Sequence, residues 1–208
     1  MTDAQFFWSW IVQFLIAAGT IGAVLAALYG NWFRAKFFPP KLSVRIANSD
    51  GDKTITRFDR GGEIEECDTR WYHLRVENDQ RWSPATQVSV NIIKIELIDA
   101  AGLPFTSWTG DVPLKWRHQQ IRQLNPTVGP GLDCDLFYVA KGRWLELQPM
   151  IAPFNMKHLH QGPCRMFVTV RASSVETDSD LLRIEIAWDG AWSEDREEMR
   201  AHLVFKPA

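Results

Sequence analysis

The chain has 208 residues, room for about one ordinary domain of roughly 100–200 residues and an appendage. Hydrophobic residues make up 46% of it, which excludes wholesale disorder. The net charge of −2 provides no broad cationic surface, so nonspecific nucleic-acid binding is not expected. Three cysteines cannot form a closed disulfide framework, which favours a reducing compartment.

The N-terminal segment predicts a membrane span. No Asp, Glu, Lys or Arg occurs from residue 4 to residue 33, and residues 11–28 are almost wholly apolar. A bilayer core of about 30 Å needs about 20 apolar residues in an α-helix. We therefore expect a short external tail over residues 1–5 and a transmembrane helix over residues 6–30. A buried core helix is the alternative, which the length of the segment disfavours.

Aromatic residues at both ends of this segment are typical of an uncleaved anchor. Trp8 and Trp10 lie at one end, and Tyr29 and Trp32 lie at the other, where amphipathic rings suit the two headgroup layers. A cleaved signal peptide is a second alternative. However, the first five residues carry no positive charge, and no convincing small-x-small cleavage site precedes Arg34.

Positive charges follow the predicted span but do not precede it. Arg34, Lys36, Lys41 and Arg45 all lie on its C-terminal side. Because cationic flanks stay in the cytoplasm, we expect the N-terminus outside and the C-terminal part inside. The sequence thus predicts a single-pass protein of the cytoplasmic (inner) membrane.

Residues 31–40 alternate aromatic and cationic side chains and predict an interfacial linker. Their rings suit the headgroup layer, while Arg34 and Lys36 suit anionic lipid. Pro39 and Pro40 should end any helix and mark the boundary to the remaining domain.

Small residues form one stripe on the predicted span. Gly19, Ala23, Ala26 and Gly30 follow one another at helical spacing, so they share one face. Small residues let two helices approach closely in lipid, and Gln13 can add an interhelical hydrogen bond. We therefore expect a homo-oligomer formed through this helix. The alternative is that Gly and Ala are simply common in spanning helices.

Residues 41–208 predict an antiparallel immunoglobulin-like β-sandwich, which makes the protein mainly β. Apolar and polar residues alternate with a period of two, as in half-buried strands, over residues 41–46, 71–77, 87–92, 166–172 and 182–188. Residues 133–139 are a more buried candidate strand. Seven to nine short strands with Gly, Asn and Pro turns favour a sandwich.

Two local features refine this prediction. The alternation changes phase at Ile92 and Ile93, which indicates a β-bulge or, alternatively, a strand that crosses between sheets. Only residues 194–202 look helical in this part, with Ser193 as the expected N-cap and acidic residues in the first turn.

Residues 76–90 carry a family resemblance, with the sequence VENDQRWSPATQVSV. This segment resembles the V-x-N … A-x-x-V-x-V hairpin of bacterial immunoglobulin-like adhesion and cell-surface modules, in which an Asn-containing turn links two sandwich strands. The whole layout resembles uncharacterised bacterial proteins with one N-terminal span and a cytosolic β-domain. The resemblance implies the fold and transfers no activity.

Candidate metal and catalytic motifs are few. His158, His160 and Cys164 have zinc-ligand residue types but lack a fourth ligand, so a loop before a strand is the favoured interpretation. Asp133 and Asp135 form a D-x-D on a predicted strand, where a solvated face is favoured over a cation site. No nucleotide-binding loop or hydrolase motif is present. We expect no metal, no cofactor and no enzymatic activity.

Aromatic residues supply the ligand-binding candidates. Arg81 and Trp82 lie in a predicted loop, and Trp108 and Trp192 lie near predicted turns. Exposed Trp and Arg side chains are favoured at binding hot spots. The alternative is that these rings pack at the ends of the sandwich.

The sequence therefore favours a non-enzymatic, membrane-tethered module that holds a protein or a small ligand at the cytoplasmic membrane surface. The alternative is a signal-sensing effector whose helices oligomerise and perturb the membrane. Compact bacterial defence proteins that join a span to a β-domain binding a cyclic nucleotide are broadly similar in architecture. The bilayer is the one partner that both hypotheses require.

Overall fold

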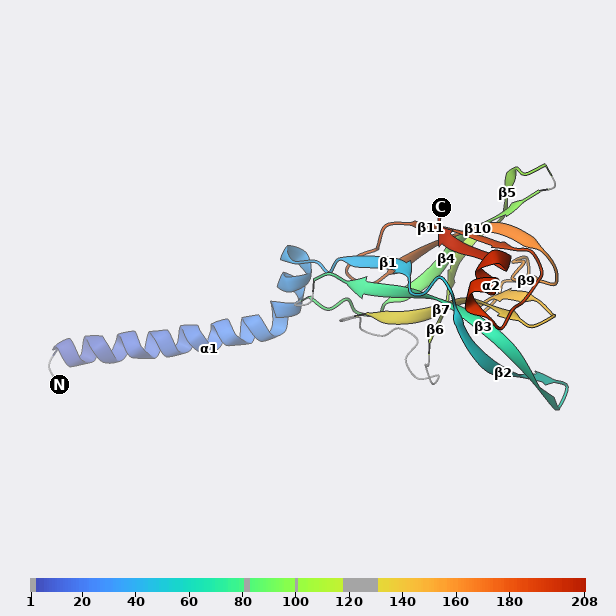
Figure 1. Cartoon of the computed structure of the whole chain (residues 1–208). Helices are drawn as coiled ribbons and strands as arrows, with labels where there is room; N and C mark the ends of the chain where they lie inside the picture. The colour runs from blue at the N-terminus through green and yellow to red at the C-terminus, as the bar shows by residue number, and fades with distance from the viewer. Residues whose placement is uncertain (1–2, 81–82, 100, 118–130) are drawn as a thin grey trace. The chain divides into compact units, whose positions relative to one another are not determined.

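The computed structural model describes residues 3–80, 83–99, 101–117 and 131–208. The chain divides into two compact units, Met1–Pro39 and Pro40–Ala208. The first contains one long helix, and the second contains two antiparallel sheets and a short helix (Figure 1). The expected class, mainly β with one N-terminal apolar helix, is confirmed.

Helix α1 (Asp3–Phe37) forms the first unit. The elements of the second unit are, in chain order, β1 (Leu42–Ile46), β2 (Asp52–Arg60), β3 (Glu63–Asn78), β4 (Ser89–Ile98), β5 (Pro104–Pro113), β6 (Lys115–Trp116), β7 (Leu132–Ala140), β8 (Leu145–Leu147), β9 (Leu159–His160), β10 (Cys164–Ser173), β11 (Leu182–Trp188), α2 (Arg196–His202) and β12 (Leu203–Pro207).

Helix α1 is long and apolar enough to cross a membrane over Phe7–Gly30, a stretch of 24 residues. None of the most apolar part of this stretch is buried against the rest of the chain, and Leu28 is 69% exposed. The helix continues through most of the expected linker and ends just before Pro39 and Pro40, whose rings and missing N–H groups disfavour further helix.

The strands of the second unit form a seven-stranded and a five-stranded sheet. The first has the order β1-β3-β7-β8-β9, with β2 also paired to β3 and β6 also paired to β7. The second has the order β12-β11-β10-β4-β5. These twelve strands exceed the expected seven to nine, because β6, β8 and β9 are too short to produce an alternating sequence pattern.

The two sheets share one hydrophobic core in a sandwich-like arrangement. Tyr72 of β3 stacks on Phe137 of β7 with ring centroids 4.5 Å apart. Phe205 of β12, in the other sheet, meets Tyr72 edge-to-face at 5.5 Å. All three side chains are buried, so this aromatic group joins the sheets. The immunoglobulin type of the sandwich stays a prediction.

A β-bulge interrupts β4 at Ile93, as the phase change in the sequence predicts. On the neighbouring strand β10, Val170 lies opposite Ile92 but Thr169 lies opposite Lys94, which leaves Ile93 without a partner in the ladder. The bulge allows apolar side chains on both sides of it to face the core. A strand that crosses between sheets is not needed at this position.

Strands β3 and β4, whose ends include the first and last residues of the 76–90 segment, do not form a hairpin. The two strands belong to different sheets and do not pair. Asn78 holds the connection because its side-chain oxygen accepts hydrogen bonds from the backbone N–H groups of Lys41 and Gln80. Its amide nitrogen donates to the backbone oxygen of Ser83 at 2.8 Å.

Helix α2 (Arg196–His202) is capped by Asp195, which corrects the expectation that Ser193 is the N-cap. The Asp195 carboxylate accepts hydrogen bonds from the backbone N–H groups of Glu197 and Glu198. Ser193 lies too early to reach these groups, and its hydroxyl accepts instead from the backbone N–H of Asp195. The cap satisfies two N–H groups that lack partners within the helix.

Substitutions at two glycines can separate the effect of backbone strain on stability from the effect of packing. Gly51 and Gly61 both have φ of 67°, but a Cβ at Gly51 would lie 2.8 Å from side-chain atoms of Arg70 and Tyr72, whereas Gly61 has open space. We expect Gly51→Ala to lower the unfolding free energy by about 2–4 kcal/mol, from strain and overpacking together.

Gly61→Ala is the matched control. We expect it to lower the unfolding free energy by about 1 kcal/mol, from the strained φ alone. Urea denaturation of the full chain in detergent micelles, followed by tryptophan fluorescence, measures both losses. Equal losses for the two variants would contradict the packing argument.

Candidate functional site

The outer face of the seven-stranded sheet carries a group of polar side chains. On β3 the residues that alternate with the core, Trp71, His73 and Arg75, point to this face. On the neighbouring β7, Asp133 and Asp135 point the same way on either side of buried Cys134. These positions belong to strands that are far apart in the sequence.

A second β-bulge sets the register at this point. On β7, Phe137 lies opposite Tyr72, but Asp135 lies opposite His73, so Leu136 has no partner in the ladder. The pairing therefore places the carboxylate of Asp135 beside the imidazole of His73. Bulges often re-aim side chains next to functional sites.

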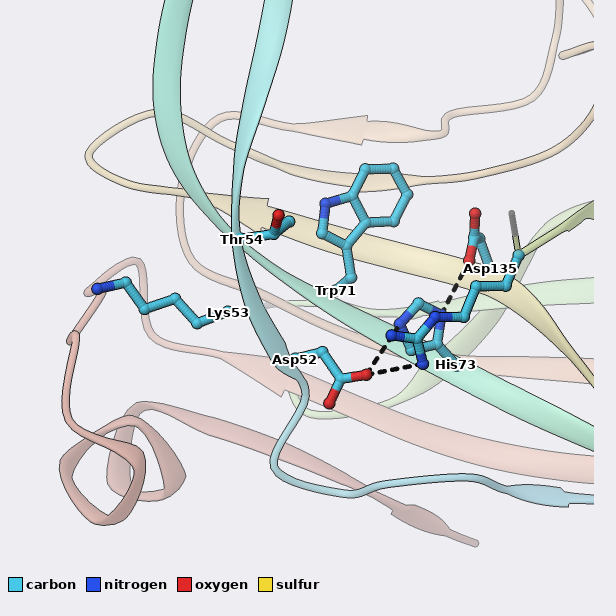
Figure 2. A pocket seen from close by; sticks show the side chains of 7 residues that line it. Asp52, Lys53, Thr54, Trp71, His73 and Asp135 are labelled. Carbon is cyan, nitrogen blue, oxygen red and sulfur yellow. Dashed lines mark hydrogen bonds and ion pairs between the residues drawn. The ribbon is translucent and has the colours of Figure 1, made fainter. Parts of the chain in front are cut away.

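A pocket of about 320 Å³ opens on this face (Figure 2). Its volume is at the low end of the range for small-molecule sites, about 300–1,000 Å³. Strands β2, β3 and β7 and the end of β6 supply its lining residues, Asp52, Lys53, Thr54, Trp71, His73, Arg117 and Asp135.

His73 lies between two carboxylates and is only 3% exposed. Its Nδ1 lies 2.8 Å from Oδ1 of Asp135. An ionised carboxylate only accepts hydrogen bonds, so Nδ1 carries the proton. The other nitrogen, Nε2, lies 3.6 Å from Oδ2 of Asp52 and has no hydrogen-bond partner within the described part of the chain.

The carboxylate of Asp52 lies close to the side chains of His73, Arg117 and Asn48. One carboxylate oxygen, Oδ2, lies 2.8 Å from a guanidinium nitrogen of Arg117. The other, Oδ1, accepts a hydrogen bond from the side-chain amide of Asn48 at 3.2 Å. The same Asp52 oxygen, Oδ2, therefore lies close to both the guanidinium of Arg117 and Nε2 of His73.

Asp133 and Asp135 share one strand face, as the sequence predicts, but each has a separate partner. Arg75 donates two hydrogen bonds to Asp133, at 2.7 and 3.0 Å, and these bonds hold the pKa of that carboxyl below its ordinary value. Asp135 contacts His73. Among the described residues, no group of three or more His, Cys, Asp or Glu side chains is arranged to hold a metal ion.

Trp71 forms an aromatic wall of the pocket. Its indole nitrogen donates to the hydroxyls of Thr56 and Thr69, each at 3.1 Å. Its ring lies 4.8 Å from that of Tyr138, in a small apolar cluster on the outer face. The hydrogen bonds and the ring contact fix the indole in one orientation.

Of the sequence-predicted ligand residues, Trp108 and Trp192 do not line this pocket. Trp108 is 6% exposed and belongs to the main core, where its ring packs over Gly110, so the expectation of an exposed position near a turn is wrong. Trp192 is half-buried against the same core, with the ammonium of Lys141 5.2 Å from its ring. Arg81 and Trp82 lie outside the described residues.

Sequence reasoning missed the residues that meet here. The available signal was Trp71 and His73, which stand on the polar side of a predicted strand, where an indole is unusual. Asp52, in contrast, ends the segment Asn-Ser-Asp-Gly-Asp over residues 48–52, whose composition is typical of a turn. Arg117 gave no signal at all, because its position depends on which strand lies beside β7.

Most residues singled out for packing or anchoring of the predicted span are exposed on α1. The small residues Gly19, Ala23 and Ala26 are exposed, Gly30 is half-buried, and Gln13 is exposed. The predicted interface anchors with described side chains are also exposed, namely Trp8, Trp10, Tyr29, Trp32 and Lys36. The side chain of Arg34 lies outside the described ones.

A second hollow, of about 410 Å³, brings Cys164 near an ion pair of Asp189 and His202. His202 Nδ1 lies 2.8 Å from Oδ2 of Asp189. Burial raises the pKa of the Cys164 thiol to about 11, so this thiol is protonated at neutral pH. A protonated thiol is a poor nucleophile and a poor metal ligand.

Comparison with known protein families and with curated proteins finds no match to this chain. The function therefore has to be inferred from the residues themselves and from their geometry.

His160 supplies a test of pH dependence. It is buried, and burial lowers its pKa from 6.5 to about 4, so the folded state holds the neutral ring. The stability from this neutral ring is present above pH 6.5 and is lost as the pH falls towards 4. Over that interval we expect the wild type to lose roughly 2–3 kcal/mol more unfolding free energy than His160→Leu.

Urea denaturation of both proteins at the two ends of this pH interval measures the difference. His158→Leu is the control, because its side chain is less buried and no such excess is expected there. An equal pH response of wild type and His160→Leu would refute the assignment.

Proposed function

We propose that this protein is a non-enzymatic, membrane-tethered binding module. In this proposal α1 spans the cytoplasmic membrane, and the pocket around His73 holds a small ligand at the cytoplasmic membrane surface. The observation that carries the proposal is the combination of an uncovered apolar helix and a polar pocket in one chain.

The exposure of α1 supports the membrane anchor. Large apolar side chains such as Leu15 and Ile16, each 63% exposed, lie all around the helix. Leaving apolar surface in water costs about 25 cal/mol per Å², so a bilayer stabilises such a helix strongly. Lys36 and Lys41 after the span favour a cytoplasmic location for the β-unit.

The chemistry of the pocket supports binding over catalysis. The described side chains paired with His73 are the carboxylates of Asp52 and Asp135, and the one hydroxyl residue of the described lining, Thr54, is not hydrogen-bonded to it. Burial raises the pKa of the Cys134 thiol well above its ordinary value. The charged groups that converge on this pocket can fix the orientation of a small ligand, and Trp71 supplies an aromatic wall.

Membrane fractionation tests the anchor. We expect the full chain to remain in the membrane pellet after an alkaline carbonate wash, because the span is held by apolar burial rather than by charge. A chain lacking residues 1–39 should appear in the aqueous fraction. Protease added to intact cells should leave the β-unit undigested, and the same protease should digest it once the membrane is opened.

Recovery of the full chain in the aqueous fraction would contradict the anchor. Digestion of the β-unit in intact cells would contradict the cytoplasmic orientation alone.

A second candidate function is the oligomerising membrane effector. It is favoured by the open space around Gly19 and Gly30, where a Cβ atom would meet nothing within 4 Å. If copies pack through this face, Gly19→Leu with Ala23→Leu should lower the oligomer size measured in detergent, because bulky side chains separate the helices.

Ala17→Leu is the matched control, since residue 17 lies on the opposite side of the helix. Its oligomer size should equal that of the wild type. An unchanged size for the Gly19→Leu and Ala23→Leu protein would count against packing through this face, and unchanged membrane activity would count against the effector.

A further inference from the structure

We propose that the pocket around His73 binds a small organic cation, either an ammonium or a guanidinium, whose charged end shares the Asp52 carboxylate with Arg117. This inference rests on the proposed function, in which the same pocket holds a small ligand, and it specifies the chemical class of that ligand.

The unpartnered nitrogen of His73 indicates what is missing from the pocket. The His73 side chain is 4% exposed, and its protonated Nδ1 is held by Asp135. A charged N–H beside a carboxylate closes to about 2.7–2.9 Å. The 3.6 Å between Nε2 and Oδ2 of Asp52 is instead the spacing of two acceptors that lack a shared donor. A ligand N–H group that lies beside both atoms, within hydrogen-bond distance of each, would be that donor.

The charge balance favours a positive ligand. Around the floor of the pocket, the described carboxylates are Asp52, Asp133 and Asp135, and the described guanidiniums are those of Arg75 and Arg117. The ammonium of Lys53, which also lines the pocket, is paired with Glu194 outside this group. Lys115 lies opposite Asp135 in the β6–β7 ladder, but its ammonium donates to Gln148 at 3.3 Å. Among the three carboxylates and two guanidiniums named above, one negative charge is in excess when His73 is neutral, and a monocation compensates it.

Arg117 shows how a cation is accommodated. Its guanidinium lies 2.8 Å from Asp52 and 4.0 Å from Asp133. Asp52 uses one oxygen for Arg117 and the other for Asn48, which leaves lone pairs on both oxygens. A ligand cation can therefore bind beside Arg117 or displace it.

Trp71 supplies the second half of the recognition. Its indole nitrogen is satisfied by Thr56 and Thr69, so the ring contributes an apolar, electron-rich face to the pocket. Cations bind over tryptophan faces more favourably than over other aromatic rings. The pocket of about 320 Å³ admits a ligand of a few carbon atoms and not a folded partner.

Calorimetric titration of the full chain in detergent micelles tests the ligand class. The probes are butylguanidinium, butylammonium, uncharged butylurea of matched shape, and inorganic phosphate. We expect the two cations to bind and butylurea to bind at least about tenfold more weakly, because it lacks the charge. N-acetylargininamide represents an arginine side chain, and tighter binding of this probe would identify a polypeptide as the source of the cation.

Two variants test the geometry with opposite signs. Asp52→Asn keeps the shape of the side chain and should weaken butylguanidinium binding about tenfold or more. Arg117→Ala removes the competing guanidinium and should strengthen that binding. Asp68→Asn is the matched control, since this carboxylate has 30% side-chain exposure, pairs with Lys141 and lies outside the pocket. The affinity of this variant for butylguanidinium should equal that of the wild type.

The outcomes separate the ligand class from the proposed function. If phosphate binds and Arg117→Ala abolishes its binding, the pocket is an anion site, so the ligand class is wrong while the binding role stands. If butylurea binds as well as butylguanidinium, or Arg117→Ala weakens cation binding, the class is likewise wrong. If no probe of any charge binds the wild type, both the ligand class and the role of this pocket in the proposed function fail.

Discussion

The two-sided packing of strand β3 is the constraint on which the rest of the β-unit depends. Successive side chains of a strand point to opposite faces, so one backbone places Tyr72 in the core and both Trp71 and His73 on the outer face. A shift of one residue would move every core side chain to the outer face. The burial of Tyr72 against Phe137 and Phe205 therefore also holds the pocket residues in position.

Two bulges adapt this regular pattern to different purposes. The bulge at Ile93 keeps a long strand in contact with the core after the phase of its alternation changes. The bulge at Leu136 lies in the wall of the pocket and brings Asp135 opposite His73. The first bulge thus serves packing between the sheets. The second serves the polar network, in which a buried imidazole needs a partner for each nitrogen.

The apolar helix and the pocket differ in their surroundings. None of the most apolar part of α1 is buried, so its burial requires surroundings that the described part of the chain does not supply. The pocket, in contrast, contains paired charged groups and, among its described lining residues, one unpartnered buried nitrogen, Nε2 of His73. The proposed function, a membrane tether with a polar binding pocket, was inferred from these two features together.

The sequence by itself determined the apolar helix, its end before Pro39, the mainly β class of the remaining chain and the bulge at Ile93. These features follow from hydropathy and from alternation along a single segment, which are local properties. Only the tertiary structure brought Asp52, His73 and Arg117 together and buried Trp108 in the core. Which strands become neighbours depends on packing between distant segments, and no local pattern records that choice.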